Sequence, residues 1–172
     1  SFPTRRSSDL NHPHLLAKAP LGNLDQFMEN VNREIALRIN HKLRRKGNFW
    51  STRYKPLAVT TDKDLEEALL YIITNPVKHG AARHPSRWRG LSSYEQSLSE
   101  EKKTYSFRHY SEVDEDKKVT YHDLVISPLP KLAEMTKEER ISYLSAQIEA
   151  RTELVIAERE AKGQGFMSEE QV

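Results

Sequence analysis

The chain has 172 residues, 37% of them hydrophobic, and a formal net charge of +2, which is enough sequence for one domain with an appendage. It contains no cysteine, so disulfides and thiolate metal sites are excluded and a cytoplasmic location is expected. We expect neither a membrane span nor a secretory leader, because no apolar run has the required length or flanks.

The modest net charge hides two halves of opposite sign. Residues 11–90 carry 14 Lys and Arg against 7 Asp and Glu, whereas residues 91–172 carry 11 against 17. A basic first half indicates a polyanionic partner such as a nucleic acid. The acidic second half is typical of a solvating or interacting segment.

The chain begins with SFPTRRSSDL, residues 1–10. Read backwards into codons, this segment resembles a sequencing-adapter primer, so we expect it to be non-native and exclude it from fold reasoning. The next residues include His12 and His14, which flank a single proline. In a strand, alternate side chains share a face, and two neutral imidazoles so placed can bind one divalent ion. A turn with exposed histidines is the alternative.

A long apolar stripe at helical spacing predicts an amphipathic helix over residues 24–45. The stripe consists of Leu24, Phe27, Met28, Val31, Ile35, Ile39 and Leu43. The distal end of this helix is basic, with Arg44, Arg45 and Lys46. Stabilisation of the helix C-terminus and a phosphate-binding patch both fit these cations.

Residues 49–60 are rich in aromatic and β-branched side chains and predict a strand. Trp50 and Arg53 place a π face beside a cation there, as surfaces that bind single-stranded nucleic acid do. Core packing is an equally physical role for the Trp50 ring.

Residues 61–80 predict a second helix, with Leu65, Leu69 and Ile72 facing a core. We expect Pro76 to end it, because the residue before a proline is pushed out of helical geometry. Tyr71 and Asn75 are four apart and therefore project from the same side. They could be a nucleophile and a metal ligand, or a packing residue and a C-terminal cap.

The remaining chain is less clearly patterned. A basic stretch follows Gly80, residues 97–118 predict a polar linker, and residues 119–126 predict a strand or a short helix. A capping box, Thr136 to Glu139, predicts a helix that runs to about Lys162.

The order of these motifs and the residues in them resemble those of a known family. Asn-His-x-His-Leu-Leu, an amphipathic helix, Gly-x-Phe-Trp-x-x-Arg-Tyr and then Tyr-Ile-x-x-Asn-Pro-Val-Lys-x-Gly are similar to the REP-associated tyrosine transposases, relatives of the small IS-element transposases in the HUH nuclease superfamily. The match covers about residues 11–96.

The resemblance implies an α+β fold: a partial ferredoxin-like antiparallel sheet with packed helices, with the histidine pair on a central strand. It also implies a domain over residues 11–96 whose N-terminal strands are missing, followed by an acidic, mainly helical extension over residues 97–172. A monomer and a homodimer both remain open.

The resemblance further implies a transposase that cuts and rejoins single-stranded or hairpin DNA, often at REP elements, through a 5′-phosphotyrosine intermediate. By position, Tyr71 matches the nucleophile, and His12, His14 and Asn75 match the ligands of a Mg²⁺ or Mn²⁺ ion. We expect the DNA to contact basic and aromatic residues, namely Arg44, Arg45, Lys46, Trp50, Arg53, Lys78, Arg83 and Arg87. The alternative is an inactive DNA-binding remnant or truncated fragment.

Overall fold

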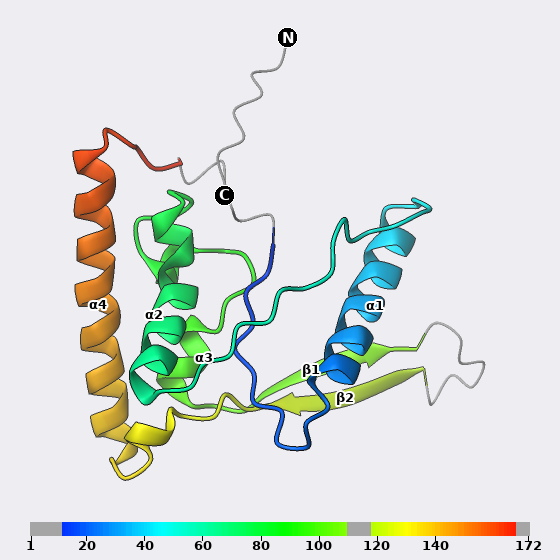
Figure 1. Ribbon diagram of the computed structural model, residues 1–172, viewed down its shortest axis with the longest axis horizontal. Coiled ribbons are helices and arrows are strands. Elements are labelled where there is room, and N and C mark those ends of the chain that lie inside the picture. The colour runs from blue at the N-terminus through cyan, green and yellow to red at the C-terminus, as the bar shows by residue number, and fades with distance from the viewer. Residues whose placement is uncertain (1–11, 110–117, 168–172) are drawn as a thin grey trace. The chain divides into compact units, whose positions relative to one another are not determined.

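The computed structural model describes residues 12–109 and 118–167 of the chain (Figure 1). The described residues divide into two compact units. One unit is Leu16–Val59, and the other contains the residues up to Leu15 together with those from Thr60 onward. The expected domain boundary after residue 96 stays a prediction.

The smaller unit is built on helix α1, Leu24–Lys42, close to the predicted bounds. None of its residues is fully buried, and Phe27 and Leu37 of its apolar stripe are exposed. The chain returns along α1 after Gly47, where the Trp50 indole nitrogen donates a 2.9 Å hydrogen bond to the Asn32 carbonyl. The Trp50 ring is therefore partly used for packing.

The strand expected over residues 49–60 is wrong, because this segment is irregular throughout. A strand needs a neighbouring strand to satisfy its backbone groups, and the described residues of this unit contain none. Pro56 also removes a donor from any such ladder. The aromatic residues that suggested a strand instead form a T-shaped pair, Phe49 with Trp50, at 4.7 Å between ring centroids.

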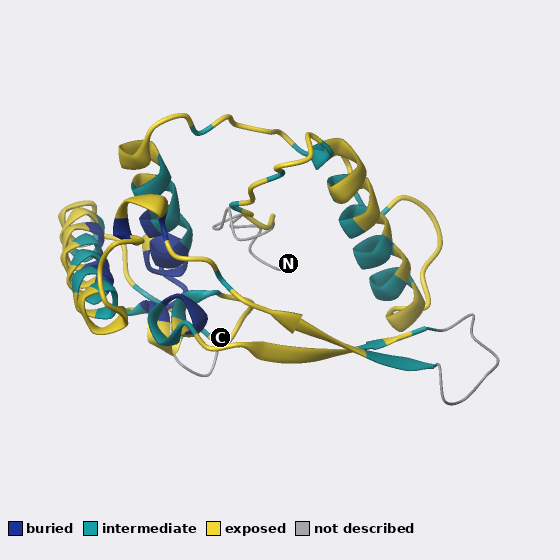
Figure 2. Cartoon of the chain, turned by 90° about the horizontal axis from the view of Figure 1, so that it is seen from below, coloured by how far each residue is buried: buried dark blue, intermediate teal, exposed yellow. Residues whose placement is uncertain are grey.

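The larger unit is centred on two helices, α2 at Asp62–Lys78 and α4 at Lys137–Ala161. Short elements connect them, namely the 3-10 helix η2 at Pro85–Arg87, α3 at Tyr94–Ser99, strand β1 at Lys103–Arg108, strand β2 at Val119–Leu124 and the 3-10 helix η4 at Pro130–Leu132. Buried residues gather on the sides of α2, α3 and α4 that face one another (Figure 2). Their centre is Leu70 and Ile73 of α2 against Leu144 and Ile148 of α4.

Helix α2 runs through Pro76, so the expectation that this proline ends the helix is wrong. The ring costs one backbone hydrogen bond, but the last turn is held by others. His79 N donates to Asn75 O, and Ala81 N donates to Pro76 O. The helix ends at Lys78, and Gly80 follows with a positive φ of 73°, a conformation that glycine adopts without strain.

The described sheet is a two-stranded antiparallel hairpin of β1 and β2, with Tyr105 opposite His122. Of the two alternatives predicted for residues 119–126, a strand or a short helix, the strand is thus confirmed. The linker expected over residues 97–118 is wrong where β1 lies. Tyr105 and Phe107 do alternate with polar residues there, but the surrounding segment is charged and most of β1 is exposed, so it reads as polar overall.

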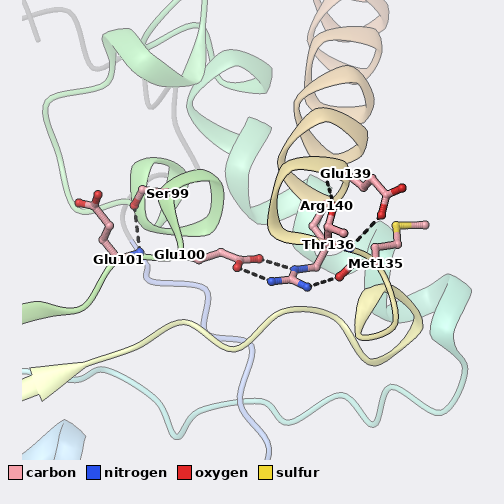
Figure 3. A network of polar contacts seen from close by, with 7 residues as sticks. All are labelled: Ser99, Glu100, Glu101, Met135, Thr136, Glu139 and Arg140. Carbon is pink, nitrogen blue, oxygen red and sulfur yellow. Dashed lines mark hydrogen bonds and ion pairs between the residues drawn. The ribbon is translucent and has the colours of Figure 1, made fainter.

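A polar network joins α3 to the start of α4 (Figure 3). Both Glu100 carboxylate oxygens accept hydrogen bonds of 2.6 Å from Arg140. Arg140 also donates to the Met135 carbonyl at 2.5 Å. Beside it, Thr136 and Glu139 form the predicted capping box. This bidentate pair fixes the loop before α4 in one geometry.

The α+β class, the antiparallel sheet and the helical C-terminal region are all confirmed. In the described part of the chain, no helix combines the length and apolar character that crossing a membrane requires.

Candidate active site

One side of α2 carries the side chains expected to react. Tyr71, Asn75 and Lys78 are spaced by four and three residues, so they lie in a row along the helix. Tyr71 is half-buried and Lys78 is exposed, whereas Asn75 is only 4% exposed. The phenol is therefore not enclosed in packed hydrocarbon.

The histidine segment lies against this row. The rings of His12 and His14 meet at 4.6 Å between centroids, with an interplanar angle of 65°. His14 in turn meets the Tyr71 ring edge-on, at 5.3 Å and 89°. The three side chains that the sequence nominated from distant positions thus form one continuous group, although residues 12–22 form no strand. Proline between the histidines suits this irregular backbone.

Asn75 has a buried oxygen for which the described residues provide no partner. Its Oδ1 atom is inaccessible to solvent and accepts no hydrogen bond from any of them. Such an orphaned acceptor is rare in folded proteins and calls for an explanation. A bound cation would supply one, because an amide oxygen is an ordinary ligand for Mg²⁺ or Mn²⁺.

The electrostatics around His14 favour its neutral form. Burial lowers the pKa of His14, and the charges of His12, His79 and Lys78 lower it further. A neutral imidazole is the form that binds metal ions. The position of His79 at the C-cap of α2 thus contributes to the site, a role that the sequence did not suggest.

Lys78 places a positive charge beside the phenol. Its ammonium nitrogen lies 4.6 Å from the Tyr71 ring centroid. Among the residues that the structure describes, no carboxylate forms an ion pair with Lys78. This cation is therefore available to an anionic ligand.

The donor set fits a divalent ion of intermediate hardness. Within residues 12–109 and 118–167, no three His, Asp or Glu side chains are grouped to hold a metal. The ligands that the family resemblance nominates are the imidazoles of His12 and His14 and the Asn75 amide oxygen. Two nitrogen donors and one oxygen suit Mn²⁺ better than Mg²⁺.

The residues expected to contact DNA are divided between the two units. Arg44, Arg45, Lys46, Trp50 and Arg53 belong to Leu16–Val59, and Lys78, Arg83 and Arg87 belong to the other unit. In the first group, Arg45 donates to the Asn48 carbonyl at 3.4 Å, and Arg53 is exposed. In the second group, Arg87 is exposed at the end of η2.

The end of α2 contacts residues that the sequence did not nominate. Arg159 of α4 donates a 2.7 Å hydrogen bond to the Lys78 carbonyl, and Met167 N donates to Gly80 O at 2.7 Å. The Arg83 guanidinium lies over the Phe166 ring. No spacing rule links positions so far apart in the chain, so the sequence alone gave no signal for these contacts.

The chain was compared with protein families, curated proteins and solved structures, and none of them matches it.

Proposed function

We propose that this chain is a metal-dependent tyrosine nuclease and strand transferase that acts on single-stranded or hairpin DNA, as a transposase does. The observation that carries the proposal is the contact between His14 and Tyr71, with His12 against His14. A tyrosine that only packs against the core needs neither the His14 imidazole at its ring edge nor the Lys78 ammonium 4.6 Å from its ring centroid.

In the proposed reaction, the Tyr71 phenol oxygen attacks a backbone phosphorus and forms a phosphotyrosine bond. The bond from phosphorus to the 3′ oxygen of the preceding nucleotide breaks, and this oxygen takes up a proton while the phenol loses one. The phosphoester is conserved, so the reverse attack by a 3′ hydroxyl rejoins the strand without a nucleotide cofactor.

The surrounding side chains have separate tasks. Lys78 neutralises a phosphate oxygen beside the phenol, and His14 orients the Tyr71 ring by its edge-on contact. His12, His14 and Asn75 are the residues that would hold Mg²⁺ or Mn²⁺. When bound, such an ion polarises the phosphate and offsets the charge that develops on it.

The experiment is a covalent-adduct assay. The 172-residue chain is incubated with Mn²⁺ and a labelled oligonucleotide that carries a hairpin and single-stranded flanks, and adducts are resolved on a denaturing gel. Tyr71→Phe removes only the attacking oxygen and should abolish the adduct. Tyr94→Phe is the matched control, because Tyr94 also meets a histidine, His84, edge-on at 5.7 Å.

Equal adduct yields from wild type and Tyr71→Phe would overturn the assignment of the nucleophile. Salt-sensitive binding without any adduct would instead favour the alternative, a DNA-binding remnant without chemistry. The cations at the end of α2, which form no ion pair with a described carboxylate, would then be the functional feature.

A further inference from the structure

Phe166 lies between two arginines at the end of α2. Its ring centroid is 4.8 Å from the Arg83 guanidinium carbon and 5.0 Å from that of Arg159. Guanidinium groups are attracted to aromatic faces, and stacking limits their rotation. The ring therefore holds Arg83 in a restricted orientation at the surface.

The segment that carries Phe166 is itself anchored. It follows α4 and returns toward the end of α2 (Figure 1), where Met167 N bonds to the Gly80 carbonyl at 2.7 Å. Arg159 donates to the carbonyls of Lys78 and Gly165. A Cβ atom on Gly80 would lie only 2.2 Å from Arg159 Nη2, so this close approach depends on glycine.

Three cations gather at this place, Lys78, Arg83 and Arg159, and no carboxylate among the described residues pairs with them. Arg159 directs donors at carbonyls, whereas Arg83 is exposed and makes no hydrogen bond to another described residue. A stacked, exposed guanidinium with unused donors matches the geometry of a phosphate group.

We propose that Arg83 binds a backbone phosphate of single-stranded DNA, and that Phe166 and Arg159 are positioning residues that present it. The inference rests on the DNA ligand of the proposed function but not on its chemistry. It assigns the C-terminal helix a role in holding the substrate.

The test is fluorescence anisotropy with a labelled single-stranded oligonucleotide in EDTA, so that no covalent step occurs. Affinity is measured between about 50 mM and 200 mM salt, because each lost phosphate contact lowers the slope of log K against log salt by about 0.7. Arg83→Gln should weaken binding several-fold and reduce the slope by that amount. Lys63→Gln, which removes an exposed charge at the other end of α2, is the matched control and should not change the slope.

Phe166→Ala separates positioning from charge. It removes no charge, yet it should reduce the slope as Arg83→Gln does, and the double variant should show no further reduction. Phe166→Tyr keeps the ring and should restore wild-type binding. An unchanged slope in Phe166→Ala would show that the ring is only structural.

An unchanged slope in Arg83→Gln, or a wild-type chain that does not bind the oligonucleotide, would overturn the phosphate site itself. The proposed chemistry fails separately, because its test is the Mn²⁺-dependent adduct. Binding that depends on Arg83 without any adduct would refute the nuclease and leave this inference standing.

Discussion

The imidazole of His14 meets the phenol ring of Tyr71 edge-on, at 5.3 Å between centroids. The two residues come from an irregular segment and from the middle of a helix, so neither local structure nor propensity brings them together. Their contact joins the His-x-His segment and the Tyr-Ile-x-x-Asn-Pro motif in one place.

Metal binding can be tested by thermal unfolding. Mn²⁺ should raise the unfolding midpoint of the wild type, because a ligand that binds only the folded state stabilises it by about 2.7 kcal/mol at a concentration of 100 times Kd. Asn75→Leu and His14→Ala should each abolish the rise, whereas His84→Ala should preserve it. A rise of equal size in Asn75→Leu would remove this amide from the ligand set.

Asn75→Leu also tests the orphaned amide oxygen. Replacing a buried, unpaired acceptor by an apolar group of similar size removes a desolvation cost. We expect the variant to unfold at the same or a higher denaturant concentration than the wild type while it loses the DNA adduct. Clear destabilisation would mean that the amide serves the fold.

The pairing of Glu100 with Arg140 predicts a pH-dependent contribution to stability. The hydrogen bonds from Arg140 lower the pKa of Glu100 below its usual value. The pair therefore stabilises the fold at pH values above the pKa of Glu100 in the unfolded chain, about 4.3. This stabilisation is lost as the pH falls through the lower pKa that Glu100 has in the folded chain. Unfolding midpoints of wild type and Glu100→Gln should differ at neutral pH and converge in acid.

Glu153→Gln is the control for that pH series, because Glu153 is exposed on α4. Its midpoint should follow that of the wild type at every pH. A Glu100→Gln difference that persists in acid would exclude the ion pair as its cause.

Gly80→Ala should destabilise the chain more than Gly163→Ala does. Both positions have positive φ, and an added Cβ there costs about 1–2 kcal/mol of backbone strain. Only at Gly80 does the new atom also clash with Arg159, since nothing lies within 4 Å at Gly163. Urea unfolding of the two variants measures the difference, and equal losses would show that Arg159 moves aside freely.

The burial of side chains on α4 predicts that two substitutions on this helix will differ in their cost to stability. Ile148 is 1% exposed and Leu154 is 60% exposed, both on α4. Ile148→Ala should cost about 2–5 kcal/mol of unfolding free energy because it leaves a cavity between α2 and α4. Leu154→Ala should be nearly neutral. Similar losses would indicate that the face of α4 away from α2 is also covered.

Much of the helical structure follows from the sequence, because 3.6-residue periodicity and caps are local signals. The apolar stripe of α1, the apolar spacing in α2 and the Thr136 capping box each placed a helix correctly. The prediction that Pro76 ends α2 failed because hydrogen bonds donated by the backbone amides of His79 and Ala81 offset the local cost of a proline in the helix.

The strands and the surroundings of Tyr71 were harder to predict. Residues 103–108 have no fully buried side chain, so the strand lacks the apolar face that a core would require. The aromatic run at 49–60 lies in a unit whose described residues contain no strand. Motif order nominated His12, His14 and Asn75, but Arg159 and Phe166 reach the end of α2 only through the packing of α4.

The burial of Leu70 and Ile73 beneath α4 has a consequence for any shortened version of this protein. A fragment that stops near residue 96 would keep every motif of the family resemblance, but it would expose the apolar side chains of Leu70 and Ile73 to water. Such a fragment should aggregate or lose its helix, so the motif-bearing half depends on the acidic half to remain folded.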